Sequence, residues 1–158
     1  MLKLNIGCGD KYIPGFVNCD RHGDVDQKCD AFPLPFQTDE VDELWAIHLL
    51  EHIHRRDASN VLTEWFRVLK PGGLLVLELP CLDKISKLIV AGEKNIRLTL
   101  LGLYGDPRDP KPDMMHQWCW SIGELTESLV SVGFEQVTVK EPIFHIPARD
   151  MRIEARKP

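Results

Sequence analysis

The chain has 158 residues, of which 44% are hydrophobic and 27% charged, and its formal net charge is −5 at pH 7. This length and composition predict a single globular domain over residues 1–158 with one sizeable core, and they exclude a disordered or membrane-spanning chain. The acidic balance disfavours a nucleic-acid backbone as the main partner, because phosphate binding requires a basic surface.

The cysteines and the N-terminal residues indicate a cytoplasmic protein. Five cysteines occur, at positions 8, 19, 29, 81 and 119, without a Cys-x-x-Cys pair. The apolar patch at the N-terminus breaks at Gly7, so we do not expect a signal peptide. We therefore expect reduced thiols and no disulfide framework.

Short apolar runs predict the strands, and apolar residues at helical spacing predict the helices. Strands are expected at 2–6, 16–20, 41–47, 74–79, 134–139 and 150–157, with a weakly strand-like segment at 24–30. Helices are expected at 57–70, 82–92 and 121–133, and loops at 32–36 and 104–113.

Two local signals mark the ends of the third helix. Ser121 and Glu124 form a capping box, in which each side chain reaches a backbone N–H of the other residue. Gly133 suits the position after the last turn. The final strand, 150–157, is expected at the edge of the sheet.

The alternation of strands and helices predicts an α/β fold with a mainly parallel sheet. Ligands bind such sheets at the carboxyl ends of the strands. The residues that follow positions 6, 20, 30, 47 and 79 are therefore the candidates for a functional site.

Three short segments at these positions carry candidate chemistry. The turn Gly7-Cys8-Gly9 allows a ligand to approach the backbone, and Asp20 could accept hydrogen bonds from a ribose diol. Asp30 with Ala31 and Phe32 could frame an adenine. Taken singly, the glycine turn is equally compatible with a plain tight turn, and the residues alone favour a surface or turn carboxylate for Asp20 and Asp30.

A nicotinamide dinucleotide site is disfavoured by the spacing of the same residues. The fingerprint G-x-G-x-x-G would require glycine at position 12, which is Tyr12. The acidic residue of that motif follows after about 20 residues, whereas Asp20 comes too early.

Taken together, the segments "LNIGCG", "GFVNCD", "PLPFQTDEVDELWA" and "EWFRVLKPGGLLVLELP" resemble the class I S-adenosylmethionine-dependent methyltransferases. The branch that the chain resembles most is methyltransferase type 11, and the resemblance covers about residues 2–139. It implies a Rossmann-like three-layer sandwich whose sheet is mostly parallel, with an antiparallel C-terminal edge strand. It also implies S-adenosyl-L-methionine as the cofactor and a transferase activity.

The resemblance implies roles for the residues at the strand ends. The residues expected to contact the cofactor are Gly7, Cys8, Gly9, Asp20, Asp30, Ala31, Phe32, Ile47 and His48. Of these, Asp20 would bind the ribose hydroxyls, and Ile47 and His48 would face the sulfonium and the substrate. The chain departs from many relatives at Asn5 and Asp10, and its first helix is almost absent.

The segment "IHLLEH" also fits H-x-x-E-H, a pattern of some zinc peptidases. Such a site needs a further ligand at a recognisable spacing, and the sequence shows none, so we expect no metal. The candidate catalytic residues are His48, His52 and His116. Each histidine has a structural alternative, because a base also needs proton-transfer geometry.

The acceptor of the methyl group is not identified by these patterns. The acidic charge and the small size favour a small molecule or a glycan over nucleic acid, and no membrane partner is expected. A non-catalytic module with the methyltransferase fold, which binds the cofactor or a partner, is the alternative. The oligomeric state is not predicted.

Overall fold

The computed structural model of the chain describes residues 1–109 and 114–158. The elements in chain order are β1 (Lys3–Ile6), β2 (Val17–Asp20), β3 (Gln27–Lys28), β4 (Val41–Ile47), the 3₁₀ turn η1 (Leu50–His52), α1 (Ala58–Val68), β5 (Leu69–Pro80), α2 (Leu82–Val90), α3 (Leu100–Tyr104), α4 (Ile122–Val132), β6 (Glu135–Lys140) and β7 (Asp150–Arg156). The expected strands and long helices are all present. The short helix α3 was not expected, and residues 110–113 of the predicted loop lie outside the described residues.

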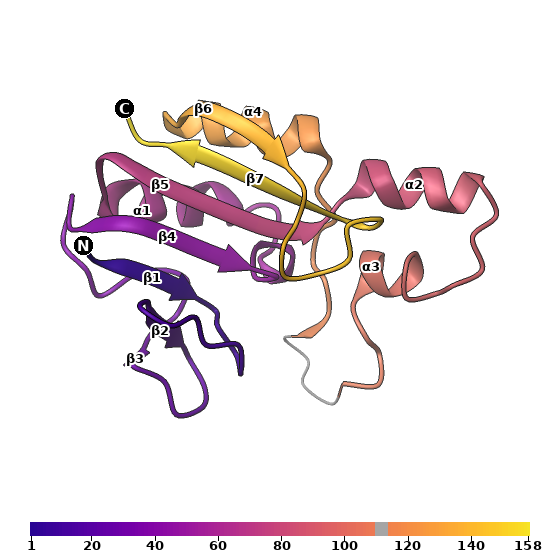
Figure 1. Cartoon of the computed structure of the whole chain (residues 1–158), viewed down its shortest axis with the longest axis horizontal. Coiled ribbons are helices and arrows are strands. Elements are labelled where there is room, and N and C mark those ends of the chain that lie inside the picture. Colours follow the sequence, from indigo (N-terminus) through magenta and orange to yellow (C-terminus); the bar gives the residue numbers. More distant parts are fainter. Residues whose placement is uncertain (110–113) are drawn as a thin grey trace.

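The strands form one seven-stranded sheet in the order β3-β2-β1-β4-β5-β7-β6 (Figure 1). The first five strands in this order pair in parallel, whereas β7 runs antiparallel to both of its neighbours. The mostly parallel, Rossmann-like sheet agrees with the prediction. The carboxyl ends of β1, β2, β4 and β5 consequently meet at one edge, where a ligand site is expected.

The C-terminal strand is antiparallel, as expected, but it does not lie at the edge of the sheet. It is inserted between β5 and β6, so that β6 is the edge strand. Met151, Ile153 and Ala155 of β7 are buried in the core, whereas most side chains of β6 are exposed. The more apolar strand therefore occupies the inner position, where both of its neighbours protect it from water.

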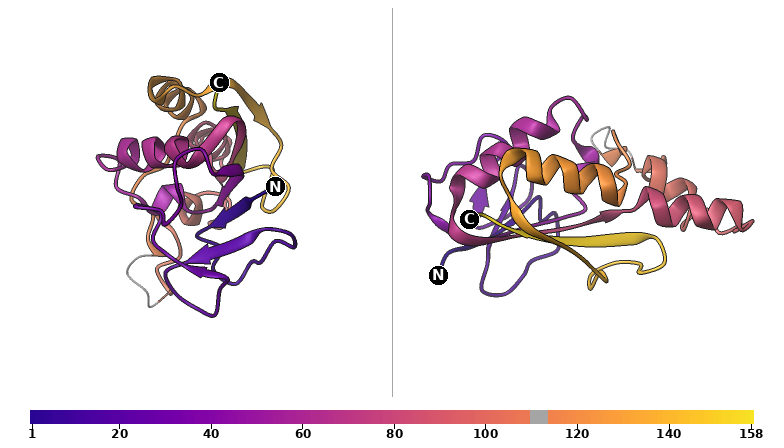
Figure 2. Two further views of the ribbon diagram at one scale, coloured as in Figure 1. Left: turned by 90° about the vertical axis from the view of Figure 1, so that its left-hand side faces the viewer. Right: turned by 90° about the horizontal axis from the view of Figure 1, so that it is seen from above.

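Helices α1 and α4 contact each other and cover one face of the sheet, as the two side views show (Figure 2). Their buried faces include Leu62, Trp65, Leu125 and Leu129. Helices α2 and α3 lie beyond the carboxyl ends of the strands instead of over the sheet (Figure 1). In the described residues, no helix covers the opposite face, so the expected three-layer sandwich lacks its second helical layer.

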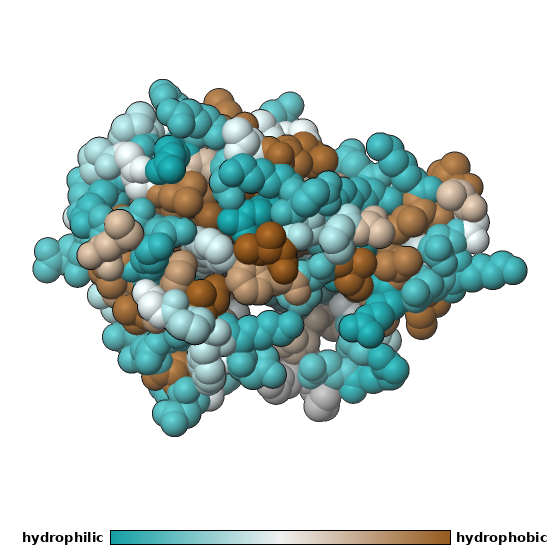
Figure 3. Space-filling view, in the orientation of Figure 1, coloured by the Kyte–Doolittle hydropathy of each residue, from teal (hydrophilic) through white to brown (hydrophobic). Residues whose placement is uncertain are grey.

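Side chains take the place of that layer. Trp45 packs edge-to-face against Phe16 and Phe144, and the guanidinium of Arg152 lies 4.7 Å from the Trp45 ring centroid. On this face, apolar residues are scattered in small groups among polar ones (Figure 3). Aromatic rings shielded by cations can cover a sheet in this way because long cationic side chains bury their stems and keep their charges near water.

The buried carboxylate of Glu78 connects β5 to the surrounding segments. It accepts hydrogen bonds from Arg152 Nη1 on β7 at 3.0 Å and from the backbone N–H groups of Ile143 and Phe144. Glu78 is fully buried, and the side chain of Arg152 is only 8% exposed. The ion pair and the two backbone bonds together compensate the cost of burying the charge.

We predict that Glu78→Ala lowers the free energy of unfolding by about 3–5 kcal/mol, because it leaves a buried cation and two backbone donors without their acceptor. Glu135→Ala, at an exposed position of β6, is the control and should change stability by less than about 0.5 kcal/mol. Urea denaturation would measure both. Equal stability of the two variants would contradict this role of Glu78.

Candidate functional site

Two clefts adjoin at the carboxyl ends of the parallel strands. The first has a volume of about 580 Å³, and its lining includes Gly7, Gly9, Asp20, Asp30, Ala31, His48, Leu49, His52 and Ile53. The second has a volume of about 520 Å³, and its lining includes Cys8, Lys11, Ile47, His48, His52, Arg97, Leu101, His116, His145 and Arg149. Both volumes are in the range of small-molecule sites. Gly7, Asp10, His48, His52 and Met114 line both clefts, which therefore share a wall.

The glycine turn and Asp20 form the floor of the first cleft. The Asp20 carboxylate accepts one backbone hydrogen bond from Gly9 and one from His22, both at 2.9 Å. These bonds fix the carboxylate, and each oxygen retains a lone pair for a further donor. Gly9 has a φ of 55°, and an added Cβ would meet nothing within 4 Å, so the backbone borders open space.

The loop that carries Asp30 is held by α1. Trp65 Nε1 donates to the Ala31 carbonyl at 3.0 Å, and the buried Glu64 accepts from the Leu34 N–H at 2.8 Å. Arg67 donates to Glu64 and to the Phe36 carbonyl. The segment "EWFRVLK" of α1 therefore holds in place the loop that forms this wall of the cleft.

The individual residues of this wall differ in their placement. Ala31 lines the cleft, whereas Phe32 is 48% exposed and lies outside the lining, so the expected apolar shelf contains only Ala31. Asp30 lines the cleft but also forms a 3.1 Å ion pair with Arg21. Cys8 and Ile47 line the second cleft. Burial raises the pKa of the Cys8 thiol to about 11, so this group stays protonated.

His48 lies where β4 ends, at a φ of 52°, and its backbone N–H donates to the Glu78 carbonyl at 2.7 Å. Its side chain is held between two acids. Nδ1 lies 2.8 Å from Glu51 Oε1, and Nε2 lies 3.4 Å from Asp150 Oδ2. The ring of His145 packs against it at a centroid distance of 3.9 Å, with the two ring planes tilted by 48°.

These neighbours determine the protonation of His48. Burial lowers its pKa, but the carboxylates of Glu51 and Asp150 outweigh this effect and raise the pKa to about 9. The pKa of His145 falls to about 4, through burial and the nearby positive charge of His48. His48 is therefore a cation at neutral pH, and it cannot act as a general base there.

His52 and His116 come together although they are far apart in the sequence. Their ring centroids are 4.9 Å apart. The loop that carries His116 is joined to η1, because the N–H groups of Gln117 and Trp118 donate to the Glu51 carbonyl. Burial lowers the pKa of His116, which leaves its ring neutral at pH 7.

Several residues of the second cleft carried no signal in the sequence. Asp150 begins β7 opposite Pro80, and Arg149 binds Asp150 through Nε and Nη2. Their placement follows from the antiparallel pairing of β5 with β7, which brings the start of the last strand to the carboxyl end of β5. In the sequence, Asp150 is recognisable only as an acid at the start of the last predicted strand.

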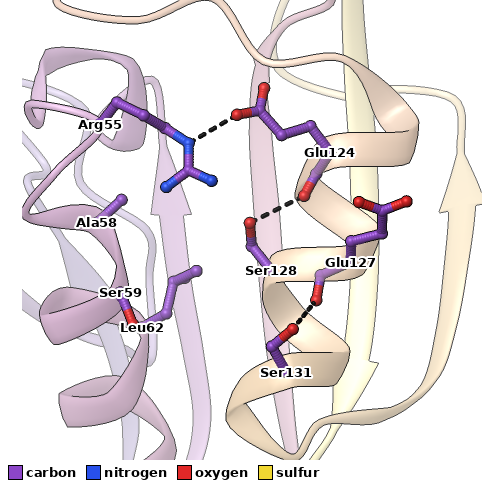
Figure 4. Close-up of a pocket in the computed structure, with 8 residues that line it drawn as sticks. All are labelled: Arg55, Ala58, Ser59, Leu62, Glu124, Glu127, Ser128 and Ser131. Atoms are coloured by element: carbon purple, nitrogen blue, oxygen red, sulfur yellow. Dashed lines mark hydrogen bonds and ion pairs between the residues drawn. The ribbon is translucent and has the colours of Figure 1, made fainter.

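A third, smaller pocket lies between α1 and α4, away from the strand ends (Figure 4). Ser121 caps α4 by accepting a hydrogen bond from the Glu124 N–H, as predicted. The side chain of Glu124 does not complete the capping box: it accepts from Arg55 Nε and Trp118 Nε1 instead. Since these polar groups bind one another, the pocket offers no set of groups that converge on a ligand.

The comparison with known families adds an independent observation. The model of the methyltransferase domain family, Methyltransf_11, matches residues 9–77. An S-adenosylmethionine-dependent methyltransferase from Archaeoglobus fulgidus has a similar structure, with a TM-score of 0.68, 17% identity, and coverage of 98% of this chain and 85% of that protein. The domain match over residues 9–77 and the similar fold both agree with the resemblance to the class I S-adenosylmethionine-dependent methyltransferases.

Two curated relatives match parts of the chain. Methyltransferase GfsG from Streptomyces halstedii is 37% identical over 40% of this chain and 23% of its own length. The ubiquinone/menaquinone biosynthesis C-methyltransferase UbiE from Desulfotalea psychrophila is 46% identical over 36% of this chain and 21% of its own. The chain thus matches less than a quarter of the length of either relative.

Family and fold imply S-adenosyl-L-methionine as the cofactor, and the first cleft fits this molecule. The open space beside Gly9 admits a ligand against the backbone. The fixed carboxylate of Asp20 can accept hydrogen bonds from two neighbouring hydroxyls. None of the helices in the described residues is long and apolar enough to cross a membrane.

We predict that Gly105→Ala displaces the loop of His116 and lowers the free energy of unfolding by about 3 kcal/mol, from strain and overpacking of ~1–3 kcal/mol each. Gly105 has a φ of 80° and a ψ of −176°, and an added Cβ would lie 2.7 Å from the Met114 carbonyl oxygen. Gly72→Ala is the control, since its φ is 78° but its Cβ would meet nothing within 4 Å. A similar loss in both variants by thermal denaturation would refute the packing constraint.

Proposed function

We propose that this chain, whose family match and fold are those of the class I S-adenosylmethionine-dependent methyltransferases, binds the cofactor in the first cleft and transfers its methyl group to an acceptor in the second. The shared wall of the two clefts carries this proposal. A reaction between two bound molecules requires adjoining sites, and His48 and His52 line both.

The cofactor residues follow from the lining of the first cleft. Asp20 binds the ribose hydroxyls, and Gly7 and Gly9 let the backbone approach the ligand. Asp30 binds the exocyclic amine of adenine and shares its charge with Arg21. Ala31 packs against the ring, and Cys8 and Ile47 lie on the acceptor side of the turn.

The protein mainly has to position the two reactants. The bound cofactor supplies a methyl group that is already activated by its sulfonium. Alignment of the reacting atoms accounts for about 7–11 kcal/mol in ideal intramolecular reactions. The cation of His48 orders Glu51 and Asp150 around the shared wall. His116 and His52 face the acceptor, where a neutral imidazole can take a proton from a hydroxyl.

A small molecule or a glycan unit is the acceptor class that this geometry favours. The second cleft is of small-molecule size, and the chain carries a net charge of −5. Two of its arginines are engaged with acids, since Arg149 binds Asp150 and Arg108 binds Asp106. These two add little free positive charge for a nucleic acid. The five free thiols favour the cytoplasm as the location.

Calorimetric titration with S-adenosylmethionine and S-adenosylhomocysteine tests the proposal, with NAD as the control ligand. We expect micromolar binding of the first two and none of NAD. Transfer is then sought with a panel of small hydroxyl, amine and sugar acceptors by detection of S-adenosylhomocysteine. Binding without transfer to any acceptor would favour a non-catalytic cofactor-binding module, and an absence of binding would reject the proposed site.

We predict that Asp20→Ala weakens S-adenosylhomocysteine binding by roughly 10- to 100-fold, since hydrogen bonds to a charged group contribute about 1.5–3 kcal/mol. Asp24→Ala is the control, because Asp24 is exposed and does not line the first cleft. Asp20→Asn keeps the shape of the side chain and should retain intermediate affinity. Unchanged affinity of Asp20→Ala in calorimetry would show that this carboxylate does not hold the ribose.

A further inference from the structure

Glu51 is a fully buried carboxylate whose contact with the His48 cation leaves both of its oxygens without a hydrogen bond. Its side chain is 1% exposed, and neither oxygen accepts a hydrogen bond from any described residue. The approach of His48 Nδ1 at 2.8 Å is an ion-pair contact without hydrogen-bond alignment. No arginine or lysine in the described part of the chain pairs with Glu51. The His48 cation offsets the charge of Glu51, and the unfilled hydrogen-bonding capacity of the buried carboxylate can accept a further positive group or bound ligand.

Two imidazoles lie near this carboxylate, and each has its Nδ1 beside a backbone carbonyl. Nδ1 of His52 lies 3.3 Å from the Met115 carbonyl, and Nδ1 of His116 lies 3.0 Å from the Gly102 carbonyl. A backbone carbonyl at Nδ1 holds the proton on that atom, and Nε2 is left as the lone-pair nitrogen. This arrangement is the usual second shell of a metal-bound histidine.

We propose that Glu51, His52 and His116 bind a divalent transition-metal ion beside the cofactor cleft. One ligand atom from each residue lies within 4.8 Å of those of the other two. Bonds of about 2.0–2.2 Å would require side-chain movements on the order of 1 Å. The metal site itself is argued from the geometry alone. Only the role of the ion, which is to hold and activate the acceptor, rests on the proposed function.

The chemistry of the three ligands selects the kind of ion. Two imidazoles with one carboxylate suit Zn²⁺, Mn²⁺ or Fe²⁺, whereas Mg²⁺ prefers a shell of oxygen atoms. Three protein ligands leave at least one position open, and His52 lines both clefts, so the ion has access to the acceptor. An acceptor hydroxyl bound there would lose its proton to solvent water more easily. His52 and His116 would then act as ligands, and neither would be the general base.

A neighbouring group, His48 with His145 and Asp150, has similar spacing but fits an ion less well. Arg149 already neutralises Asp150 through two nitrogen atoms, and the Ile146 N–H donates to the same carboxylate. Nδ1 of His48 faces Glu51. Binding of an ion at one group would therefore be lost on different substitutions from binding at the other group.

Calorimetric titration of the chelator-treated full chain with Zn²⁺, and separately with Mn²⁺ and Mg²⁺, tests the proposal. We expect one Zn²⁺ or Mn²⁺ per chain and much weaker binding of Mg²⁺. Glu51→Gln and His116→Ala should each weaken the binding at least about 100-fold, because even second-shell losses cost 10- to 100-fold. The control is His54→Ala, which removes an exposed histidine outside the group and should leave the affinity unchanged.

Circular dichroism and S-adenosylhomocysteine binding of each variant separate this test from folding and from the proposed function. Retained cofactor binding together with lost metal binding in Glu51→Gln supports the site. If the native chain binds the cofactor but no metal ion, the metal site alone is overturned. If it binds the metal ion but not the cofactor, the proposed function alone is overturned. Loss of the ion in His145→Ala but not in His116→Ala would also overturn the assignment to Glu51, His52 and His116.

Discussion

The rest of the structure depends on the position of one buried charge. Glu78 lies in β5, between β4 and β7, and its carboxylate binds Arg152 on β7 and the backbone that precedes His145. Its own carbonyl accepts the N–H of His48. One residue thus fixes the position of the inserted antiparallel strand and of His48 and His145, two histidines that line the second cleft. The apolar core and the polar cleft can lie side by side here because the hydrogen bonds and the ion pair of Glu78 compensate its buried charge.

The elements that could be predicted from the sequence are those that local pattern determines. Strand β4 lies at 41–47, as expected, and Gly133 ends α4 with a left-handed φ of 114°. The order of the last two strands was predicted wrongly, because strand order depends on pairing between distant segments. Helix α3 was missed because its five residues are too few to show a helical period.

The same distinction between local pattern and contacts of distant segments applies to the candidate site. The strand-end rule placed Gly7, Asp20 and His48 near one another, since parallel strands bring their carboxyl ends to one edge. The rule has no information about His116, which reaches Glu51 through a long segment after β5. For the same reason the sequence could not show a further ligand for the pattern "HLLEH": the nearest imidazole in space is far away in the chain. Phe32 was misplaced because a loop with two prolines gives no periodicity from which to read the direction of a side chain.

The shared wall between the clefts has a consequence for how such a protein diverges. The first cleft is built almost entirely within the segment that matches the methyltransferase domain, residues 9–77, with its loop held by Trp65 and Glu64. The second cleft also draws on Arg97, His116 and Arg149, all of which lie beyond that segment. Substitutions in the later part of the chain can therefore reshape the second cleft while the first is unchanged. Family similarity in the first half of the chain therefore informs about the cofactor, whereas the acceptor has to be inferred from the second half.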